Sequence, residues 1–201
     1  VYVADTFGNT IRKITPDGVV TTVAGDGTRG SADGTGADAQ FKSPEGIAVD
    51  GSGNVYVADT FGNTIRKITP DGVVTTLAGS GTEGSADGTG ADAQFNKPLG
   101  VAVDGSGNVY VGDLLNHRIR KVTPDGVVTT LAGDGTRGSA DGTGAGAQFK
   151  SPEGVAVDGS GNVYVADTFG NTIRKITPEG VVSTLAGSGT EGSADGTGAD
   201  A

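Results

Sequence analysis

The sequence repeats itself every 54 residues, and this period limits the possible folds more than any other feature. The segment VYVADTF begins at Val1, Val55 and Val163, and its variant VYVGDLL begins at Val109. The 201 residues therefore hold three complete repeats and most of a fourth. A regular period of about this size is typical of solenoids, propellers and other arrays of one structural unit. Because the repeats abut directly, we expect residues 1–201 to form a single domain.

Each repeat carries the signals of four short strands. The predicted strands of one repeat cover residues 46–50 (GIAVD), 55–59 (VYVAD), 64–69 (TIRKIT) and 73–78 (VVTTLA). They are rich in β-branched residues and are separated by the turn sequences DGSGN, FGN and PDG. No window shows the 3.6-residue period of a helix. Tight turns between all strands favour antiparallel four-stranded sheets over the parallel coils of a β-solenoid, and the fold class is all-β.

A long glycine-rich segment links the last strand of one sheet to the first strand of the next. In the second repeat it covers residues 79–98 and includes GSGTEGSADGTGADAQF. A loop of this length in a compact fold is either functional or braced. We expect Phe41, Phe95 and Phe149 to anchor these loops by burial between neighbouring sheets. The ADAQF sequence is a candidate for one helical turn.

The repeats resemble the NHL repeat, most closely over residues 100–126, which include DLLNHRIRKVTPDG. The resemblance covers the whole chain. It implies a β-propeller, usually of six blades, in which the GVAVD strand of each blade is innermost and the VVTTLAG strand outermost. The copies are nearly identical to one another, as in engineered or recently amplified symmetric propellers.

This resemblance implies incomplete closure of the propeller. The sequence enters at the second strand of a blade and holds 15 strands of the pattern, just under four blades. The two ends of such an arc would expose apolar blade faces, and exposed faces of this kind drive association. We therefore expect the partner to be a second copy, in a head-to-tail homodimer that closes an eight-bladed ring. The strand at residues 1–5 would keep an unpaired edge near the channel.

Composition and charge exclude several classes of function. The formal net charge of −10 opposes binding to nucleic acid or to anionic lipid surfaces. No apolar run approaches the ~18 residues of a membrane-spanning helix. The chain has no cysteine, which excludes disulfides, thiolate metal sites and a cysteine nucleophile. The basic pairs Arg12/Lys13, Arg66/Lys67, Arg120/Lys121 and Arg174/Lys175 lie on strands, whose alternation places Arg and Lys on opposite sides rather than on one RNA-binding face.

Three sets of aspartates are candidate ligands. Asp5, Asp59, Asp113 and Asp167 end the VYVAD strands, where they could form a ring of ligands. We expect each instead to accept backbone N–H groups from its own FGN turn. The DGSGN segment at residues 50–54 faintly resembles a calcium loop, but its twelfth position is Phe61 rather than glutamate, so a hairpin turn is favoured. Asp33 and Asp38 could hold a cation, although Gly146 replaces the second of them in the third repeat.

His117 is the only histidine. One histidine cannot supply the three or four protein ligands of a usual zinc site, so we interpret it as a surface turn residue. The GxG strings do not lie between a strand and a helix, which leaves a phosphate-binding loop unsupported. The sequence thus predicts no catalytic, cofactor or metal site. The favoured function is a non-catalytic, self-assembling scaffold, designed or excerpted. The alternative is a natural binding module for a protein, peptide or glycan.

The loop charges alternate from repeat to repeat. Arg29 and Arg137 occupy the same loop position as Glu83 and Glu191. This pattern predicts ion pairs across the blade junctions, Arg29–Glu83, Glu83–Arg137 and Arg137–Glu191, with Glu191 meeting Arg29 of a second copy. The alternative is that the alternation records duplication of a two-blade segment.

Overall fold

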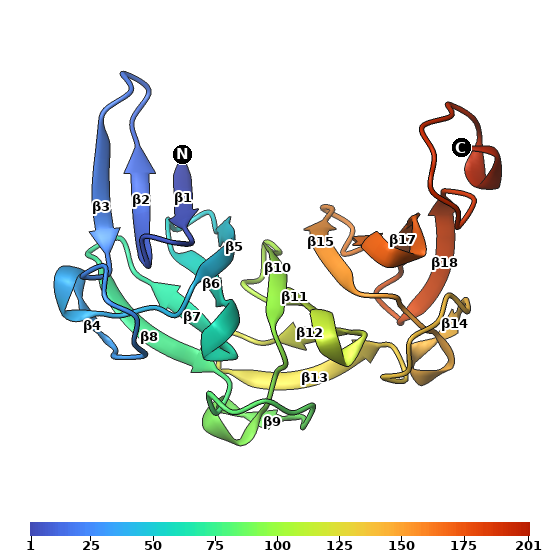
Figure 1. Ribbon diagram of the computed structural model, residues 1–201. Helices are drawn as coiled ribbons and strands as arrows, with labels where there is room; N and C mark the ends of the chain where they lie inside the picture. The colour runs from blue at the N-terminus through green and yellow to red at the C-terminus, as the bar shows by residue number, and fades with distance from the viewer.

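The computed structural model describes all 201 residues, which form four antiparallel sheets arranged as consecutive blades. Blade 1 contains β1 (Tyr2–Asp5), β2 (Thr10–Ile14) and β3 (Val20–Ala24). Blade 2 contains β4 (Gly34–Thr35), β5 (Pro44–Val49), β6 (Val55–Asp59), β7 (Thr64–Ile68) and β8 (Val73–Ala78). Figure 1 shows the blades following an open arc, with the N- and C-termini at its two ends.

Blades 3 and 4 repeat the pattern of blade 2. Blade 3 contains β9 (Gly88–Thr89), β10 (Pro98–Val103), β11 (Val109–Asp113), β12 (Arg118–Val122) and β13 (Val127–Ala132). Blade 4 contains β14 (Gly142–Thr143), β15 (Pro152–Val157), β16 (Val163–Asp167), β17 (Thr172–Ile176) and β18 (Val181–Ala186). The expected all-β class and the 15 expected strands are therefore confirmed, with the chain entering at the second strand of a blade.

The glycine-rich loops add a strand that the sequence did not predict. The strand order in blade 2 is β4-β8-β7-β6-β5, so the two-residue strand β4 extends the outer edge of the sheet beyond β8. β4 lies in the loop that leaves blade 1, and it pairs antiparallel with β8, Gly34 opposite Val74 and Thr35 opposite Val73. β9 and β14 join blades 3 and 4 in the same way. Each loop is therefore part of the blade that follows it.

The inner strands β5, β10 and β15 lie side by side on the inner side of the arc, as the resemblance implied (Figure 1). Their close approach requires glycine. A Cβ atom on Gly46 would collide with the carbonyl oxygen of Leu99 on the next blade, and one on Gly100 would collide with that of Glu153. Gly154 in blade 4 has no following blade, and a Cβ there would meet only the Ala166 side chain, at 3.3 Å.

The hydrophobic core lies between the blades as three separate clusters, one at each junction. The cluster between blades 1 and 2 joins Ile11 and Ala24 of blade 1 to Val55 and Val57 of blade 2, with Phe41 buried between them. Phe95 and Phe149 are buried in the same way at the next two junctions. The expectation that these three residues anchor the loops is confirmed.

The only helical segments are three-residue 3-10 turns. One type follows the VYVAD strand, as at Thr60–Gly62, and ends at Asn63 in the left-handed conformation, with φ 53°. The other covers the GAD residues of the loop, as at Gly36–Asp38. The single turn expected at ADAQF is therefore present, but it begins one residue earlier and ends at the aspartate. None of these helical turns has the length or apolar character needed to cross a bilayer.

Candidate functional site

A buried arginine in the third strand of each complete blade holds the incoming loop. Arg66 on β7 is fully buried. Its Nη1 atom donates to the carbonyl oxygen of Gln40 at 2.9 Å and forms an ion pair with Asp59 at 3.3 Å. Its Nη2 atom donates to the carbonyl oxygen of Ala32 at 3.0 Å and to the carboxylate of Asp33 at 2.6 Å. We call this arrangement the arginine clamp.

The clamp recurs at all three junctions, with the guanidinium close to the anchoring phenylalanine. Arg120 contacts Asp87 at 2.7 Å and Asp113 at 2.7 Å, and Arg174 contacts Asp141 at 2.6 Å and Asp167 at 3.6 Å. The guanidinium carbon of Arg66 lies 5.0 Å from the centre of the Phe41 ring, which is within cation–π range. In these three blades the arginine of each basic pair faces the core, whereas the lysine lies over a tyrosine ring of its own blade.

The loop aspartate of the clamp also binds the outer strand. Asp33 accepts hydrogen bonds from the Thr76 backbone N–H at 3.0 Å and from its hydroxyl at 3.0 Å. Desolvation of the Asp33 carboxyl raises its pKa, but the hydrogen bonds from Thr76 and Arg66 outweigh it, so the net shift is downward. Asp33 is thus engaged with a cation of the protein itself. Asp38, the other residue considered as a cation ligand, is exposed.

The aspartates at the strand ends behave differently from the expectation. Asp5 accepts the N–H of Gly8 from its own turn, as predicted. Asp59 instead accepts the backbone N–H of Lys42, at 2.6 Å, from the loop that arrives from blade 1. Asp113 and Asp167 do the same with the next two loops. The prediction was wrong for these three carboxylates because each lies against an incoming loop and accepts a backbone N–H from it. Asp5 has no incoming loop and accepts the N–H of its own turn.

Burial governs the protonation of these carboxylates. Desolvation raises the pKa of Asp59 to about 6, although the Lys42 N–H and Arg66 favour its charged form. Desolvation likewise raises the pKa of Asp113 and of Asp167. A raised pKa in a buried acid is a frequent property of catalytic groups. Here the incoming loop and the arginine enclose these carboxylates, so burial at the blade junction accounts for their raised pKa.

His117 occupies a turn position that is asparagine in the other blades, in the left-handed conformation with φ 52°. Its Nδ1 atom accepts the backbone N–H of Ser151 at 3.2 Å, as Asn9 and Asn63 accept the N–H groups of Ser43 and Lys97. Burial, and then the charge of Arg137, lower the pKa of His117. The imidazole therefore serves as a neutral acceptor at a blade turn.

The DGSGN segment forms the expected hairpin turn. Asp50 accepts the N–H groups of Ser52 and Asn54, both at 2.9 Å, and the hydroxyl of Tyr56 at 3.1 Å. These contacts occupy the carboxylate that a calcium loop would use. No three side chains of His, Asp or Glu gather where they could hold one metal ion.

The three ion pairs predicted between loop charges within one chain are not present. None of the ion pairs in the structure joins Arg29, Glu83, Arg137 or Glu191. The guanidinium carbon of Arg29 instead lies 5.2 Å from the Phe61 ring centre, and that of Arg137 lies 5.6 Å from the Phe169 ring centre. The prediction was wrong for these three pairs because Arg29 and Arg137 lie over the turn that follows the second strand of the next blade, not beside the next loop.

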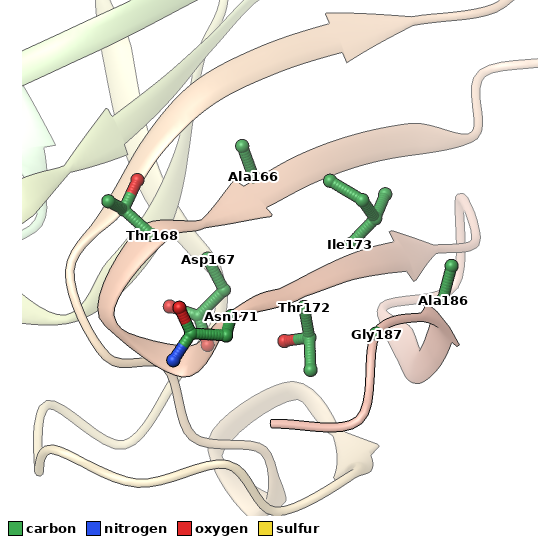
Figure 2. Close-up of a pocket in the computed structure, with 8 residues that line it drawn as sticks. All are labelled: Ala166, Asp167, Thr168, Asn171, Thr172, Ile173, Ala186 and Gly187. Atoms are coloured by element: carbon green, nitrogen blue, oxygen red, sulfur yellow. The ribbon is translucent and has the colours of Figure 1, made fainter. Parts of the chain in front are cut away.

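The open face of blade 4 carries an empty socket for a loop phenylalanine. An open pocket of about 250 Å³ is lined by Ile173, Ala186 and Gly187, with other residues of β16 and β17 around it (Figure 2). The equivalent residues of blade 1, Ile11, Ala24 and Gly25, contact Phe41. A Cβ atom on Gly25 would lie 3.2 Å from that ring. The pocket is therefore the fourth copy of a site that is filled three times within the chain.

The open face of blade 1 carries the other half of a junction. Arg12, the counterpart of Arg66, receives no loop and has one ion pair, with Asp5 at 3.5 Å. Val1, Val3 and Val20 are exposed, although their counterparts in the next blade are buried. Sequence reasoning singled out the arginines and Asp33 separately but missed their pairing. The signal was present in the constant 33-residue separation of the two residues in Asp33–Arg66, Asp87–Arg120 and Asp141–Arg174.

Comparisons with known proteins agree with this architecture. The family model described as "Teneurin NHL domain" matches residues 23–88 and 132–201, and that described as "NHL repeat" matches residues 95–122. The chloroplast protein SUPPRESSOR OF QUENCHING 1 of Arabidopsis thaliana is 34% identical over 172 residues, covering 80% of this chain and 16% of that protein. Human NHL repeat-containing protein 2 is 34% identical over 151 residues, covering 68% of this chain and 21% of that protein.

Solved β-propeller structures share the fold. An auxiliary nutrient binding protein from Bacteroides thetaiotaomicron superposes with a TM-score of 0.72 at 22% identity, covering 91% of this chain and 44% of that one. Virginiamycin B lyase from Staphylococcus aureus superposes with a TM-score of 0.61 at 17% identity, covering 92% of this chain and 50% of that one. The chain thus spans about half of these structures, and about a fifth or less of the two curated relatives above. Since the family models match more than half of the chain, it belongs to the NHL-repeat family, which includes the teneurin NHL domain.

Proposed function

We propose that this chain is a non-catalytic repeat scaffold that completes a propeller ring by head-to-tail association with a second copy. The observation that carries the proposal is the contrast between internal and terminal blade faces. Ile65 is fully buried at a junction, whereas its counterpart Ile173 on the open face of blade 4 is 41% exposed. Val55 is 1% exposed, whereas its counterpart Val1 on the open face of blade 1 is 82% exposed. Covering both faces removes apolar surface from water.

The non-catalytic part of the proposal rests on how the charged groups are used. The buried carboxylates and guanidiniums bind one another and the loop backbone, and His117 accepts a backbone N–H group. Each is occupied by a contact that recurs at the same position of other blades. A group that holds a junction in this way is not free to reach a substrate.

The mass in solution tests this function. Sedimentation equilibrium should show a concentration-dependent species of twice the 19.7 kDa chain mass. Ile173→Asp places a charge on the open face of blade 4 and should weaken this association by about tenfold or more. Leu115→Asp changes an exposed residue on an internal turn and serves as the matched control. A monomer at all concentrations, or equal weakening by both variants, would contradict the proposal.

A second candidate function is binding of a polar ligand such as a glycan or peptide. It is favoured by a groove of about 300 Å³ between blades 2 and 3, lined by Asp50, Asn54, Tyr56, Lys67 and Asp104 among others. Several polar side chains that converge on one concave site suit hydroxyl-rich ligands. Screening of glycans and peptides should yield a ligand whose affinity falls with Lys67→Ala but not with Lys13→Ala, which lies in blade 1 outside this groove. Failure of every candidate, or equal loss in both variants, would refute it.

A further inference from the structure

The last residues of the chain already have the shape of an internal loop. In residues 187–201 the Gly187 N–H donates to the carbonyl of Gly198 at 3.0 Å, and the Ser188 N–H donates to that of Ala201 at 3.1 Å. The internal loop after β3 has the same two bonds, from Gly25 to Gly36 at 3.0 Å and from Asp26 to Ala39 at 3.2 Å. The 3-10 turn Gly198–Asp200 also repeats Gly36–Asp38. We call residues 187–201 the tail.

Internal loops of this shape bind the following blade through three groups. The residues of β4 pair with the start of β8. The N–H of Gly36 donates to the carbonyl of Gly72 at 3.0 Å. The carboxylate of Asp33 binds the guanidinium of Arg66 and the N–H and hydroxyl groups of Thr76. The tail carries the counterparts of these donors and acceptors in Asp195, Gly196, Thr197 and Gly198.

Blade 1 carries the matching receptor groups without a loop to bind them. Arg12 and Thr22 are the counterparts of Arg66 and Thr76, and Val19 and Val20 are those of the strand start that pairs with β4. The Arg12 side chain is 35% exposed where that of Arg66 is fully buried, and Arg12 lacks the loop carboxylate that Arg66 binds. The chain therefore carries both halves of one more junction, unpaired, at its opposite ends.

We propose that the tail of one copy adds as a short outer strand to β3 of a second copy, with Asp195 of the first binding Arg12 and Thr22 of the second. The register follows the internal junctions and places Gly196 opposite Val20 and Thr197 opposite Val19. This inference rests on the proposed head-to-tail association and names the segment and the ion pair that direct it. Strand addition of this kind gives affinity through main-chain bonds and specificity through side chains.

The second copy is the occupant that the chemistry favours. Blade 1 offers the Arg12 cation, the free edge of β3 and exposed valines in one place. The tail offers a carboxylate at the same loop position as the carboxylates that bind the arginines of the three internal junctions. An unrelated peptide would need the same carboxylate and, three residues after it, a glycine in the left-handed conformation. This glycine is required because Gly36, Gly90, Gly144 and Gly198 all have φ between 54° and 58°.

Disulfide trapping tests the register directly, since the chain has no cysteine. Thr35 and Val73 face each other as a strand pair at the internal junction. Thr35→Cys with Val73→Cys should therefore form a disulfide within one chain and serve as the geometric reference. Mixing single variants Thr197→Cys and Val19→Cys should give a covalent heterodimer under the same oxidation, while neither variant alone cross-links to a comparable extent.

The outcomes separate this inference from the proposed function. A species of twice the chain mass without a Thr197→Cys to Val19→Cys cross-link would overturn the tail register and leave head-to-tail association standing. A monomeric wild-type chain would overturn both. Asp195→Asn should weaken the association by about tenfold or more, because charged hydrogen bonds to Arg12 and Thr22 are lost. Asp200→Asn removes the same charge five residues away and should leave it unchanged. Equal effects of the two variants would contradict the role of Asp195.

Discussion

Arg66 and Arg12 occupy the same position of the repeat but not the same environment. Arg66 has four oxygen partners and no exposed side-chain surface. Arg12 keeps only the partner on its own blade, Asp5, and is about one-third exposed. The difference comes entirely from the loop of the preceding blade, which reaches Arg66 and not Arg12. The comparison shows that a blade of this repeat is completed by its predecessor rather than by its own sequence.

The largest expected effect comes from removing the arginine of a complete clamp. Arg66→Ala should lower the free energy of unfolding by about 3–5 kcal/mol, because it leaves the buried Asp59 carboxylate unpaired. Arg12→Ala should cost less than about 1 kcal/mol in dilute solution, since its ion pair is exposed. Urea denaturation of both variants measures the difference. Equal losses would show that the incoming loop contributes nothing to the strength of the clamp.

Glycines of the inner strands give a second contrast between internal and terminal blades. Gly46→Ala should destabilise by about 1–3 kcal/mol, because the new Cβ collides with the Leu99 backbone and the inner strands must separate. Gly154→Ala should be close to neutral, because no blade follows it and only the Ala166 side chain is near. Thermal unfolding at low protein concentration compares them. A Gly154→Ala variant as unstable as Gly46→Ala would contradict this explanation of the glycines.

The sequence revealed the blades but not the way they are joined. The turn residues and alternating strands identified all 15 main strands, because these depend on local backbone chemistry. The clamp escaped prediction because it joins Asp33 of one repeat to Arg66 of the next, and each residue alone suits an exposed strand or loop. The strand β4 escaped for the same reason, since Gly34 and Thr35 lie in a glycine-rich run without a strand pattern and pair only because the loop is held in place.

The two carboxylates of one clamp should respond to pH in opposite directions. The pKa of Asp59 in the folded protein is about 6, above its usual 3.8, so the folded state binds more protons between these values. The stabilising contribution of Asp59 is therefore present below pH 4 and lost as the pH rises through 6. The pKa of Asp33 is lowered, so its contribution is present above pH 4 and lost on further acidification.

Difference curves isolate these contributions. The stability of the wild type minus that of Asp59→Asn should fall between pH 4 and pH 6, whereas the wild type minus Asp33→Asn should rise with pH below about 4. Urea titrations at a series of pH values provide both curves. The same sign of slope for the two variants would contradict the assignment of burial as the dominant influence on Asp59.

The smallest expected effect distinguishes two interpretations of the loop charges. Internal loops place Arg29 over Phe61 and Arg137 over Phe169. The tail instead offers Glu191, while blade 1 of a second copy presents Phe7, which is 97% exposed. Glu191→Arg should therefore strengthen association slightly, by about 0.5–1 kcal/mol. Weaker association would favour an attraction between Glu191 and Arg29 of the second copy, as the charge alternation alone predicted.

The amide hydrogen of Thr22 provides the most direct test that the open ends form one more junction of the same kind. At the internal junctions the N–H groups of Thr76, Thr130 and Thr184 bind loop aspartates, at 3.0–3.1 Å. We expect the Thr22 amide to exchange rapidly with solvent in dilute protein. Its exchange should slow toward the Thr76 and Thr130 rates as the concentration rises into the range where the mass doubles. Rapid Thr22 exchange that persists in the fully associated protein would contradict a junction formed between two copies.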